Sequence, residues 1–330
     1  MKTKQINHLL LATSLSVLLF ACKKSSNDNS SSTPSNTDLQ TQSEDQTKVS
    51  TETDAAFDDV NTAMTSQAAV TGSSESTPIR YGVVVEGGNQ DTVKSYICDA
   101  TVAIDTVDNP RTLTITYNGK NCNLTRTRTG SVVVSWAAGV RWQNQGAVVT
   151  VNFNNLKITA LDGKSITLNG THTYTNVSGG TLLSLTSNSA APITHTIMST
   201  NMSITFDNGA QRTWSVARQR VYSYNSGLVI TTTGLHTDGS TKGISEWGIN
   251  RFGNNFTTQI VTPLVISICN NYFQITSGEV NLTNAAGSTM ISFGLDSTGA
   301  STGCPVGSTY YFKLVWTGNG GKSYTFIWPY

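Results

Sequence analysis

The stretch from Met202 to Tyr222 contains the structural unit that recurs through most of this chain. An apolar residue occupies every second position from Met202 to Phe206, the turn sequence Asp-Asn-Gly follows, and the alternation resumes at Trp214. This pattern predicts a strand, a tight turn and an antiparallel strand. Roughly sixteen such runs lie between residues 79 and 330, so we expect a mainly β fold: an extended antiparallel sheet or sandwich-like meander.

Two segments of the β region resemble each other, which indicates an internal repeat. Residues 100–136 align with residues 278–316, and each segment has a cysteine followed by a strand that ends in tryptophan. The alignment predicts two similar halves, at about 79–190 and 191–330.

Charge is sparse and unevenly distributed along the chain. Only 12% of residues are charged. Residues 1–79 hold 5 Lys+Arg and 9 Asp+Glu, a net charge of −4, whereas residues 80–330 hold 16 and 11, a net charge of +5. A surplus of +5 spread over roughly 250 residues, without a dense basic cluster, predicts no nucleic-acid partner.

The N-terminus has the features of a lipoprotein leader. Lys2 and Lys4 precede an apolar run, residues 9–20, which ends in Ala21-Cys22. A small residue followed by cysteine resembles the lipobox of bacterial lipoproteins, which implies a signal peptide over residues 1–21 and lipidation of Cys22. We therefore expect a membrane partner through this lipid anchor and a location at the outer membrane of the cell envelope, with the periplasmic or surface face left open.

The segment after the leader changes in composition twice. Residues 22–50 are almost entirely polar, which predicts a disordered tether. Residues 51–78 are expected to form a helix and a linker, because Phe57, Val60 and Met64 fall on one helical face.

Four cysteines remain after Cys22, an even number that suits an oxidising compartment. Three pairings are open, and we favour Cys98–Cys122 with Cys269–Cys304 because each bond would close one half of the repeat. Zinc is disfavoured, since the sequence has no Cys-x-x-Cys and no histidine near these cysteines. We expect no metal and no cofactor.

No catalytic constellation stands out, so we assign no catalytic residue and expect a protein that is not an enzyme. The three histidines beyond the leader, His172, His195 and His236, lie in Thr-rich strands or turns and are expected to be structural. Glu246 and Glu279, with Asp99 or Asp105, offer only a formal acid pair of the glycosidase type.

Two further features concern sugars. Trp142 and Trp247, beside turns, are candidates for a glycan-binding platform, although core packing is the default for tryptophans in alternating strands. Thr92, Thr106 and Ser297 follow aspartate in tripeptides that resemble the Asp-Ser/Thr-apolar acceptor of Bacteroidota O-glycosylation.

Three motifs in the β region support a family resemblance. They read Cys-Asp-Ala-Thr-Val at 98–102, Asn-Gly-Ala-Gln-Arg-Thr-Trp-Ser at 208–215, and Thr-Pro-Leu-Val at 262–265 before Cys269. They resemble a group of uncharacterised Bacteroidota outer-membrane lipoproteins, a resemblance that implies no particular activity. We expect a lipid-anchored, non-enzymatic binding or scaffold module of the cell envelope, with a glycan or an envelope protein as partner. The alternatives are a carbohydrate-binding surface lipoprotein and a polysaccharide-active enzyme.

Overall fold

The computed structural model describes residues 36–66, 82–83 and 97–329, apart from 123, 186–188, 270–271 and 306–308. Cys22 and the predicted signal peptide lie outside the described residues, as does Thr92. No helix in the described part of the chain is long and apolar enough to cross a membrane.

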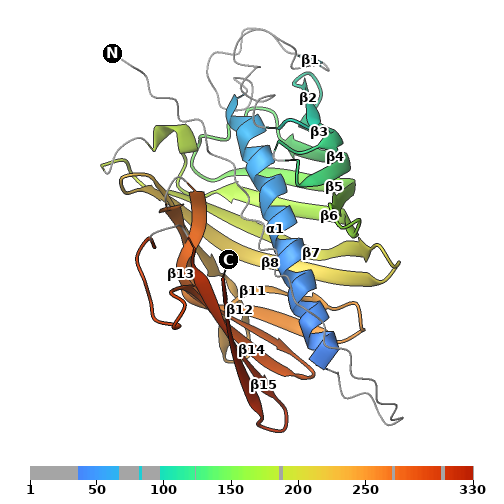
Figure 1. The fold of residues 1–330 in the computed structure, drawn as a ribbon. Coiled ribbons are helices and arrows are strands. Elements are labelled where there is room, and N and C mark those ends of the chain that lie inside the picture. Colours follow the sequence, from blue (N-terminus) through green and yellow to red (C-terminus); the bar gives the residue numbers. More distant parts are fainter. Residues whose placement is uncertain are drawn as a thin grey trace.

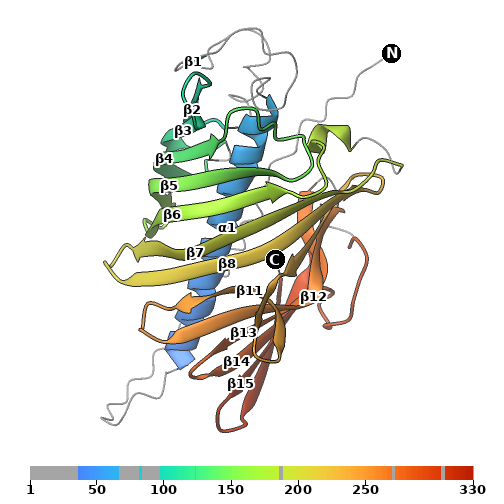
Figure 2. The same ribbon diagram turned by 180° about the vertical axis from the view of Figure 1, so that it is seen from behind.

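A single 16-stranded antiparallel sheet makes up most of the fold (Figures 1 and 2). Most strands pair with their neighbours in the sequence. The exception is that β8 pairs with β11; β9 pairs with β8 and β12, and β10 pairs with β11. The strands are β1 (Gly82–Val83), β2 (Ala100–Asp105), β3 (Arg111–Lys120), β4 (Arg126–Trp136), β5 (Ala147–Ala160), β6 (Ser165–Asn176), β7 (Ile193–Phe206), β8 (Gln211–Tyr224), β9 (Leu228–Gly234), β10 (His236–Asp238), β11 (Thr241–Ile249), β12 (Asn255–Cys269), β13 (Tyr272–Asn284), β14 (Gly287–Leu295), β15 (Tyr311–Gly318) and β16 (Ser323–Pro329). The predicted antiparallel meander is confirmed.

The alternation seen in the sequence separates the two faces of the sheet. In β7, Met202, Ile204 and Phe206 are buried while the residues between them are more exposed. Because the side chains of a strand alternate, the apolar set of each strand reaches the same core. Short turns such as the one at Asn208-Gly209 keep successive strands adjacent, and Gly209 has a φ of +79°, which glycine adopts without strain.

The α-helix α1 (Asn36–Ser66) lies across the buried face of the sheet, and its axis crosses the strands (Figures 1 and 2). Val49, Phe57, Val60 and Met64 are fully buried against the strands and belong to the main core. The Phe57 ring meets the Tyr174 ring edge to face, with centroids 4.4 Å apart. A 3₁₀ turn, η1 (Leu182–Ser184), follows β6.

The helix begins earlier than the sequence predicted. It starts at Asn36 rather than Thr51, so the second half of the predicted 22–50 tether is helical. The physical reason is that this half buries polar side chains: Gln42, Asp45 and Gln46 are each less than 9% exposed and bind polar groups of the sheet. A largely polar composition predicts disorder only where the rest of the fold offers no buried polar groups to bind the segment.

Two disulfides join Cys98 to Cys122 and Cys269 to Cys304, the favoured pairing. Each bond links the chain just before a hairpin (β2–β3 or β13–β14) to the loop just after it. The two similar segments therefore carry their cysteines at equivalent places. The sheet is continuous between them, since β6 pairs with β7 across residue 190.

Candidate functional site: the charged interface between helix and sheet

Arginine is concentrated beneath α1. The chain has nine arginines, and six of them bind side chains of this helix. They are Arg126, Arg128, Arg212, Arg218, Arg220 and Arg251. All six lie on the face that α1 covers, so this interface contains most of the guanidinium groups of the molecule.

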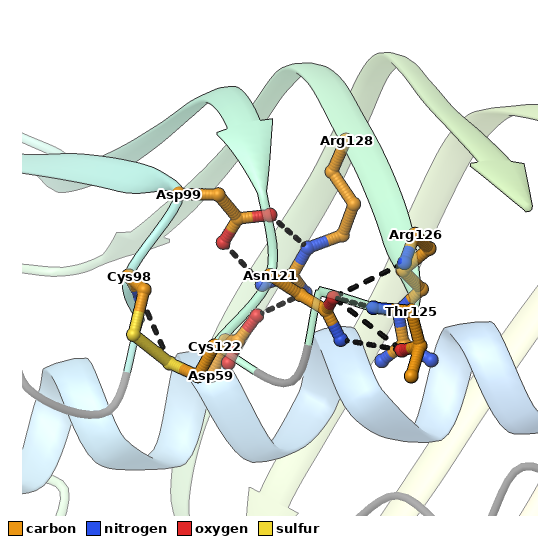
Figure 3. The surroundings of a disulfide bond; sticks show 8 residues. All are labelled: Asp59, Cys98, Asp99, Asn121, Cys122, Thr125, Arg126 and Arg128. Carbon is orange, nitrogen blue, oxygen red and sulfur yellow. Dashed lines mark hydrogen bonds and ion pairs between the residues drawn. A yellow bond between two sulfur atoms is a disulfide. The ribbon is translucent and has the colours of Figure 1, made fainter. Parts of the chain in front are cut away.

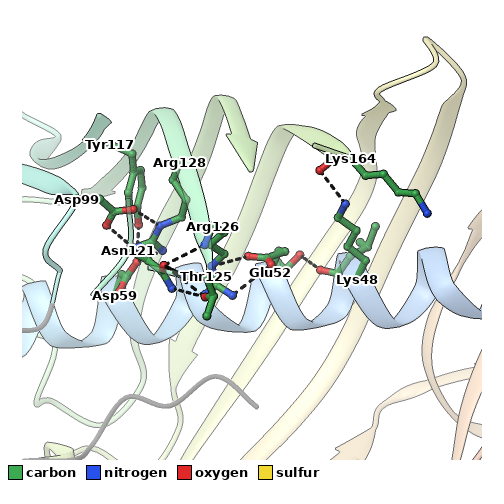
Figure 4. Close-up of polar contacts among 12 residues, drawn as sticks. Lys48, Glu52, Asp59, Asp99, Tyr117, Asn121, Thr125, Arg126, Arg128 and Lys164 are labelled. Atoms are coloured by element: carbon green, nitrogen blue, oxygen red, sulfur yellow. Dashed lines mark hydrogen bonds and ion pairs between the residues drawn. The ribbon is translucent and has the colours of Figure 1, made fainter. Parts of the chain in front are cut away.

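The C-terminal half of the helix is held by Arg128 from β4 (Figure 4). Its Nε and Nη2 donate to the two carboxylate oxygens of Asp99 at 2.7 and 2.6 Å, and its Nη1 donates to Asp59 Oδ2 of α1 at 2.6 Å. The hydroxyl of Tyr117 donates to the same Asp59 oxygen at 2.9 Å, and the Arg128 guanidinium lies 4.4 Å from the Tyr117 ring centroid. One guanidinium therefore joins the helix to two strands through bidentate and monodentate pairs.

A disulfide lies directly beside this cluster (Figure 3). Cys98 precedes Asp99 in the chain, and the bond to Cys122 ties that segment to the end of β3. The backbone N–H of Asn118 also donates to the carbonyl of Asp99 at 2.8 Å. Asp99 is thus fixed from both sides, which places its carboxylate for Arg128.

Two turns from Asp59 towards the N-terminus, Glu52 pairs with Arg126 (Figure 4). Arg126 Nη1 donates to Glu52 Oε1 at 3.2 Å, and both side chains are only about a tenth exposed. Burial raises the pKa of the Glu52 carboxyl, against the attraction of Arg126 and Arg128. Lys48 Nζ donates to the backbone carbonyl of Lys164 at 3.2 Å at the margin of this region.

The middle of the helix binds the long central strand β8. Asp54 Oδ1 accepts from Arg220 Nη2 at 2.6 Å and from Arg218 Nη1 at 3.1 Å. Arg218 also contacts Glu246 of β11, whose Oε1 accepts from the Ser50 hydroxyl at 2.9 Å. Two arginines of the sheet are therefore balanced by one acid from the helix and one from a neighbouring strand.

The N-terminal half of the helix is bound by a mixture of charged and neutral groups. Arg251 pairs with Asp45, with Nε to Oδ2 at 2.5 Å, and Arg212 donates to the amide oxygen of Gln46. The Gln42 amide oxygen accepts from two side-chain amides, those of Asn250 at 2.7 Å and Asn284 at 2.6 Å. Hydrogen bonds and charge hold α1 between Gln42 and Gln46, and Val49 is the first buried apolar side chain described in the helix.

Two predicted structural histidines lie in the core beside these charges. His172 is 1% exposed and His195 is fully buried, each surrounded by aromatic rings. Burial, with a nearby arginine, lowers the pKa of both imidazoles to about 3, so both are neutral at physiological pH. Both imidazoles lie in the buried core, and His172 Nδ1 is 3.3 Å from the Tyr174 hydroxyl oxygen.

The interface leaves little free space. A cavity of about 10 Å³ lies between the helix and the sheet, lined by Asp54, Phe57, His172, Tyr174 and Arg218 among others. That volume accommodates at most about one water molecule. This arrangement can therefore bind α1. Five of its six arginines are paired with carboxylates, whereas Arg212 donates to the neutral amide of Gln46.

The structure separates the carboxylates that the sequence suggested as an acid pair. Glu246 is 1% exposed on the helix-facing side, where it contacts Arg218. Glu279 accepts from Thr262 and Ser292 hydroxyls, which belong to the other face of the sheet. Asp99 is occupied by Arg128, and Asp105 accepts from the backbone N–H groups of its own turn. No glycosidase-like pair is formed by these four acids.

The predicted glycan platform is not formed as expected. Trp142 is only 2% exposed, and it packs on His195 in the core, so it cannot present a ring face to a sugar. The turn position that suggested exposure is covered because the β6–η1 segment folds over it, with Asn176 Nδ2 donating to the Trp142 carbonyl at 2.7 Å. Trp247 is half-buried and stacks on His236 at 4.0 Å.

The predicted O-glycosylation acceptors differ in accessibility. Thr106 is 3% exposed, which argues against modification, because the turn after β2 folds its side chain inward. Ser297 is exposed in the turn after β14, where the preceding residue, Asp296, accepts from Thr298.

Sequence reasoning missed the charged interface, although both halves carried a signal. Asp45, Glu52 and Asp59 are spaced by seven residues, which places them on one side of a helix. In β8, Arg212 and Arg218 occupy the same alternate positions as the buried Trp214, so they point inward. Inward arginines require buried polar partners, and the helix supplies Asp54 to Arg218 and the Gln46 amide to Arg212.

Comparisons with protein-family models, with curated proteins and with solved structures gave no match.

Proposed function

We propose that this chain is a lipid-anchored, non-enzymatic binding or scaffold module of the cell envelope, in which α1 couples the anchor segment to the sheet. The observation that carries the proposal is the charged interface: α1 begins shortly after Cys22 and is bound to the sheet from Gln42 to Asp59. A protein attached to a membrane through its N-terminal segment needs a firm junction between that segment and the sheet. The charged interface provides that junction.

The charge pairs suit mechanical attachment better than catalysis. Each acid beneath α1 that has been described is matched to an arginine, a tyrosine or a serine, and the adjoining cavity is about the size of one water. Catalytic acids and bases need an accessible substrate site. These groups are covered by the helix instead, and they fix its position.

The anchor is tested by membrane fractionation of cells that produce the full chain or its Cys22→Ala variant. Burial of several acyl chains contributes about 0.8 kcal/mol per CH₂, so the unchanged protein should sediment with membranes. The variant should appear in the soluble fraction, and an Ala21→Gly variant, which keeps a small residue before the cysteine, should remain membrane-bound. Membrane association that survives Cys22→Ala would contradict the anchor.

Carbohydrate binding is the second candidate function, and Trp247 supports it. Its indole is half-buried and stacks on the His236 imidazole, which leaves part of the side chain accessible. Aromatic rings of this kind bind the apolar faces of sugars. A glycan array should then show binding that Trp247→Ala abolishes, while binding that persists in this variant would remove Trp247 from consideration.

The exposed turn at Ser297 supports a separate proposal, that the protein is O-glycosylated there. The intact mass of the protein from its native host should exceed the polypeptide mass by a glycan, and Ser297→Ala should remove that excess. An unmodified mass would exclude the modification.

A further inference from the structure

Among the described residues, strand β16 forms one end of the sheet and leaves an edge open. It is last in the strand order and pairs only with β15 among the described strands. Every second residue of its backbone therefore directs an N–H and a C=O away from the sheet. Such an edge is a template for another strand, and most proteins protect it.

The usual protections are missing from β16. Its seven residues, Ser-Tyr-Thr-Phe-Ile-Trp-Pro, carry no charge, and the only proline is the last one. Its register with β15 is regular from Ser323 to Pro329, without a bulge. Tyr324 and Phe326 are 48% and 42% exposed. An uncharged, regular and apolar edge strand of this kind predicts a partner that covers it.

The aromatic rings on this strand do not form a sugar platform. Tyr324, Phe326 and Trp328 alternate and so lie on one face of the sheet. Phe326 and Trp328 stack on each other, with centroids 4.9 Å apart and planes inclined by 4°, and Tyr324 stacks on Trp316 of β15 at 5.6 Å. Because the ring faces are turned towards one another, the rings form a ridge beside the open edge.

We propose that β16 pairs with β16 of a second copy of this chain, antiparallel and centred on Phe326. The sequence is self-complementary about that residue. Phe326 would face Phe326 of the second copy, and Tyr324 would face Trp328 of the second copy, so that each aromatic residue meets another on the same face. Aromatic cross-strand pairs of this kind stabilise antiparallel sheets.

A two-fold axis perpendicular to the sheet produces this arrangement. It gives a closed, isologous interface, because the same strand serves on both sides. The axis keeps both aromatic ridges on one face and joins the two sheets into one. The open backbone groups of both edges would be satisfied at once, and no edge would remain at this end of the sheet.

The mass of the full chain carrying Cys22→Ala, measured by sedimentation, tests the pairing. The Cys22→Ala chain should be a dimer. The same chain with Phe326→Lys added should be a monomer, because two lysines would face each other at the centre of the interface. Phe252→Lys is the matched control: Phe252 is 40% exposed, but it lies in the turn between β11 and β12, so the dimer should persist. A monomer before substitution, or a dimer that survives Phe326→Lys, would overturn the proposal.

Disulfide trapping in intact cells tests the register. Phe326→Cys should give a covalent dimer on a non-reducing gel, since a directly opposed pair has Cα atoms about 4.5–5.5 Å apart, within disulfide range. Tyr324→Cys should give none, because its opposite residue is Trp328 of the second copy, and Phe252→Cys should also give none. Equal trapping at all three positions, or trapping at Tyr324→Cys alone, would contradict pairing centred on Phe326.

Discussion

Arg128 is the residue on which the C-terminal half of the interface depends. It is 5% exposed and neutralises both Asp59 and Asp99. We expect Arg128→Met to lower the free energy of unfolding by about 3–5 kcal/mol, because it leaves two buried carboxylates without a counter-charge. Urea denaturation measures this change.

A control substitution at an exposed lysine tests whether the lost stability comes from the unpaired buried carboxylates or from the removal of any positive charge. Lys157→Met, at an exposed position of β5, should change the free energy of unfolding by no more than about 0.5 kcal/mol. Adding Asp59→Asn and Asp99→Asn to Arg128→Met should recover part of the lost stability. A cost of Arg128→Met no larger than that of Lys157→Met would show that the pairs are not buried as described.

Buried titratable residues predict how stability depends on pH. The unfolded chain takes up protons at its histidines near pH 6.5, whereas the folded chain holds His172 and His195 neutral down to about pH 3. The unfolded state therefore binds more protons between these values, and the free energy of unfolding falls as the pH drops below about 6.5. Asp58 acts in the opposite direction, because burial raises its pKa to about 7, so its protonation stabilises the fold as the pH falls from 7.

Two variants distinguish these opposing contributions. His195→Phe, in a pocket of aromatic rings, should reduce the fall in the free energy of unfolding as the pH is lowered. Asp58→Asn should make that fall steeper. Urea unfolding between pH 4 and pH 8 measures both slopes. The assignment of neutral buried imidazoles would be wrong if His195→Phe left the slope between pH 4 and pH 6.5 unchanged.

At the scale of elements, the disulfide beside Asp99 should affect the helix as well as its own hairpin. Closing the 24-residue separation between Cys98 and Cys122 contributes roughly 3 kcal/mol in the chain-entropy account. The Cys98→Ser, Cys122→Ser double variant should also raise hydrogen exchange in residues 56–64 of α1, because Asp99 loses its support. The matched pair Cys269→Ser, Cys304→Ser should leave that segment unchanged, and equal effects of both double variants would contradict the link.

The sequence predicted an element well where its buried side chains are apolar, and poorly where they are polar. The strands were predictable because apolar and polar residues alternate, as in Met202 to Phe206, and the turns carry glycine. The C-terminal half of α1 was predictable because Phe57, Val60 and Met64 are apolar. The N-terminal half was not, because its buried face is Gln42, Asp45 and Gln46, residues whose burial depends on partners some two hundred positions away.

The whole molecule combines a predictable sheet with a site that depends on long-range pairing. The meander follows from short turns between neighbouring strands, and the disulfide pairing is the one favoured because each bond would close one half of the predicted repeat. The position of α1 does not follow from local pattern, since it is set by six arginines from β4, β8 and the β11–β12 turn. Trp142 was misplaced for a similar reason: its neighbourhood in the sequence is a turn, but its neighbours in space are core rings.

Buried charge pairs and hydrogen bonds hold α1 on the sheet from Gln42 to Asp59, and apolar packing continues to Met64. Hydrogen exchange of the full chain, at low salt and in about 1 M NaCl, where the Debye length is about 3 Å, tests it most directly. We predict that amides 42–64 are protected as well as those of β5 to β8, and that salt leaves this protection in place because the pairs are buried. Exchange of residues 42–50 at the rate of an unstructured peptide, in either condition, would contradict the account.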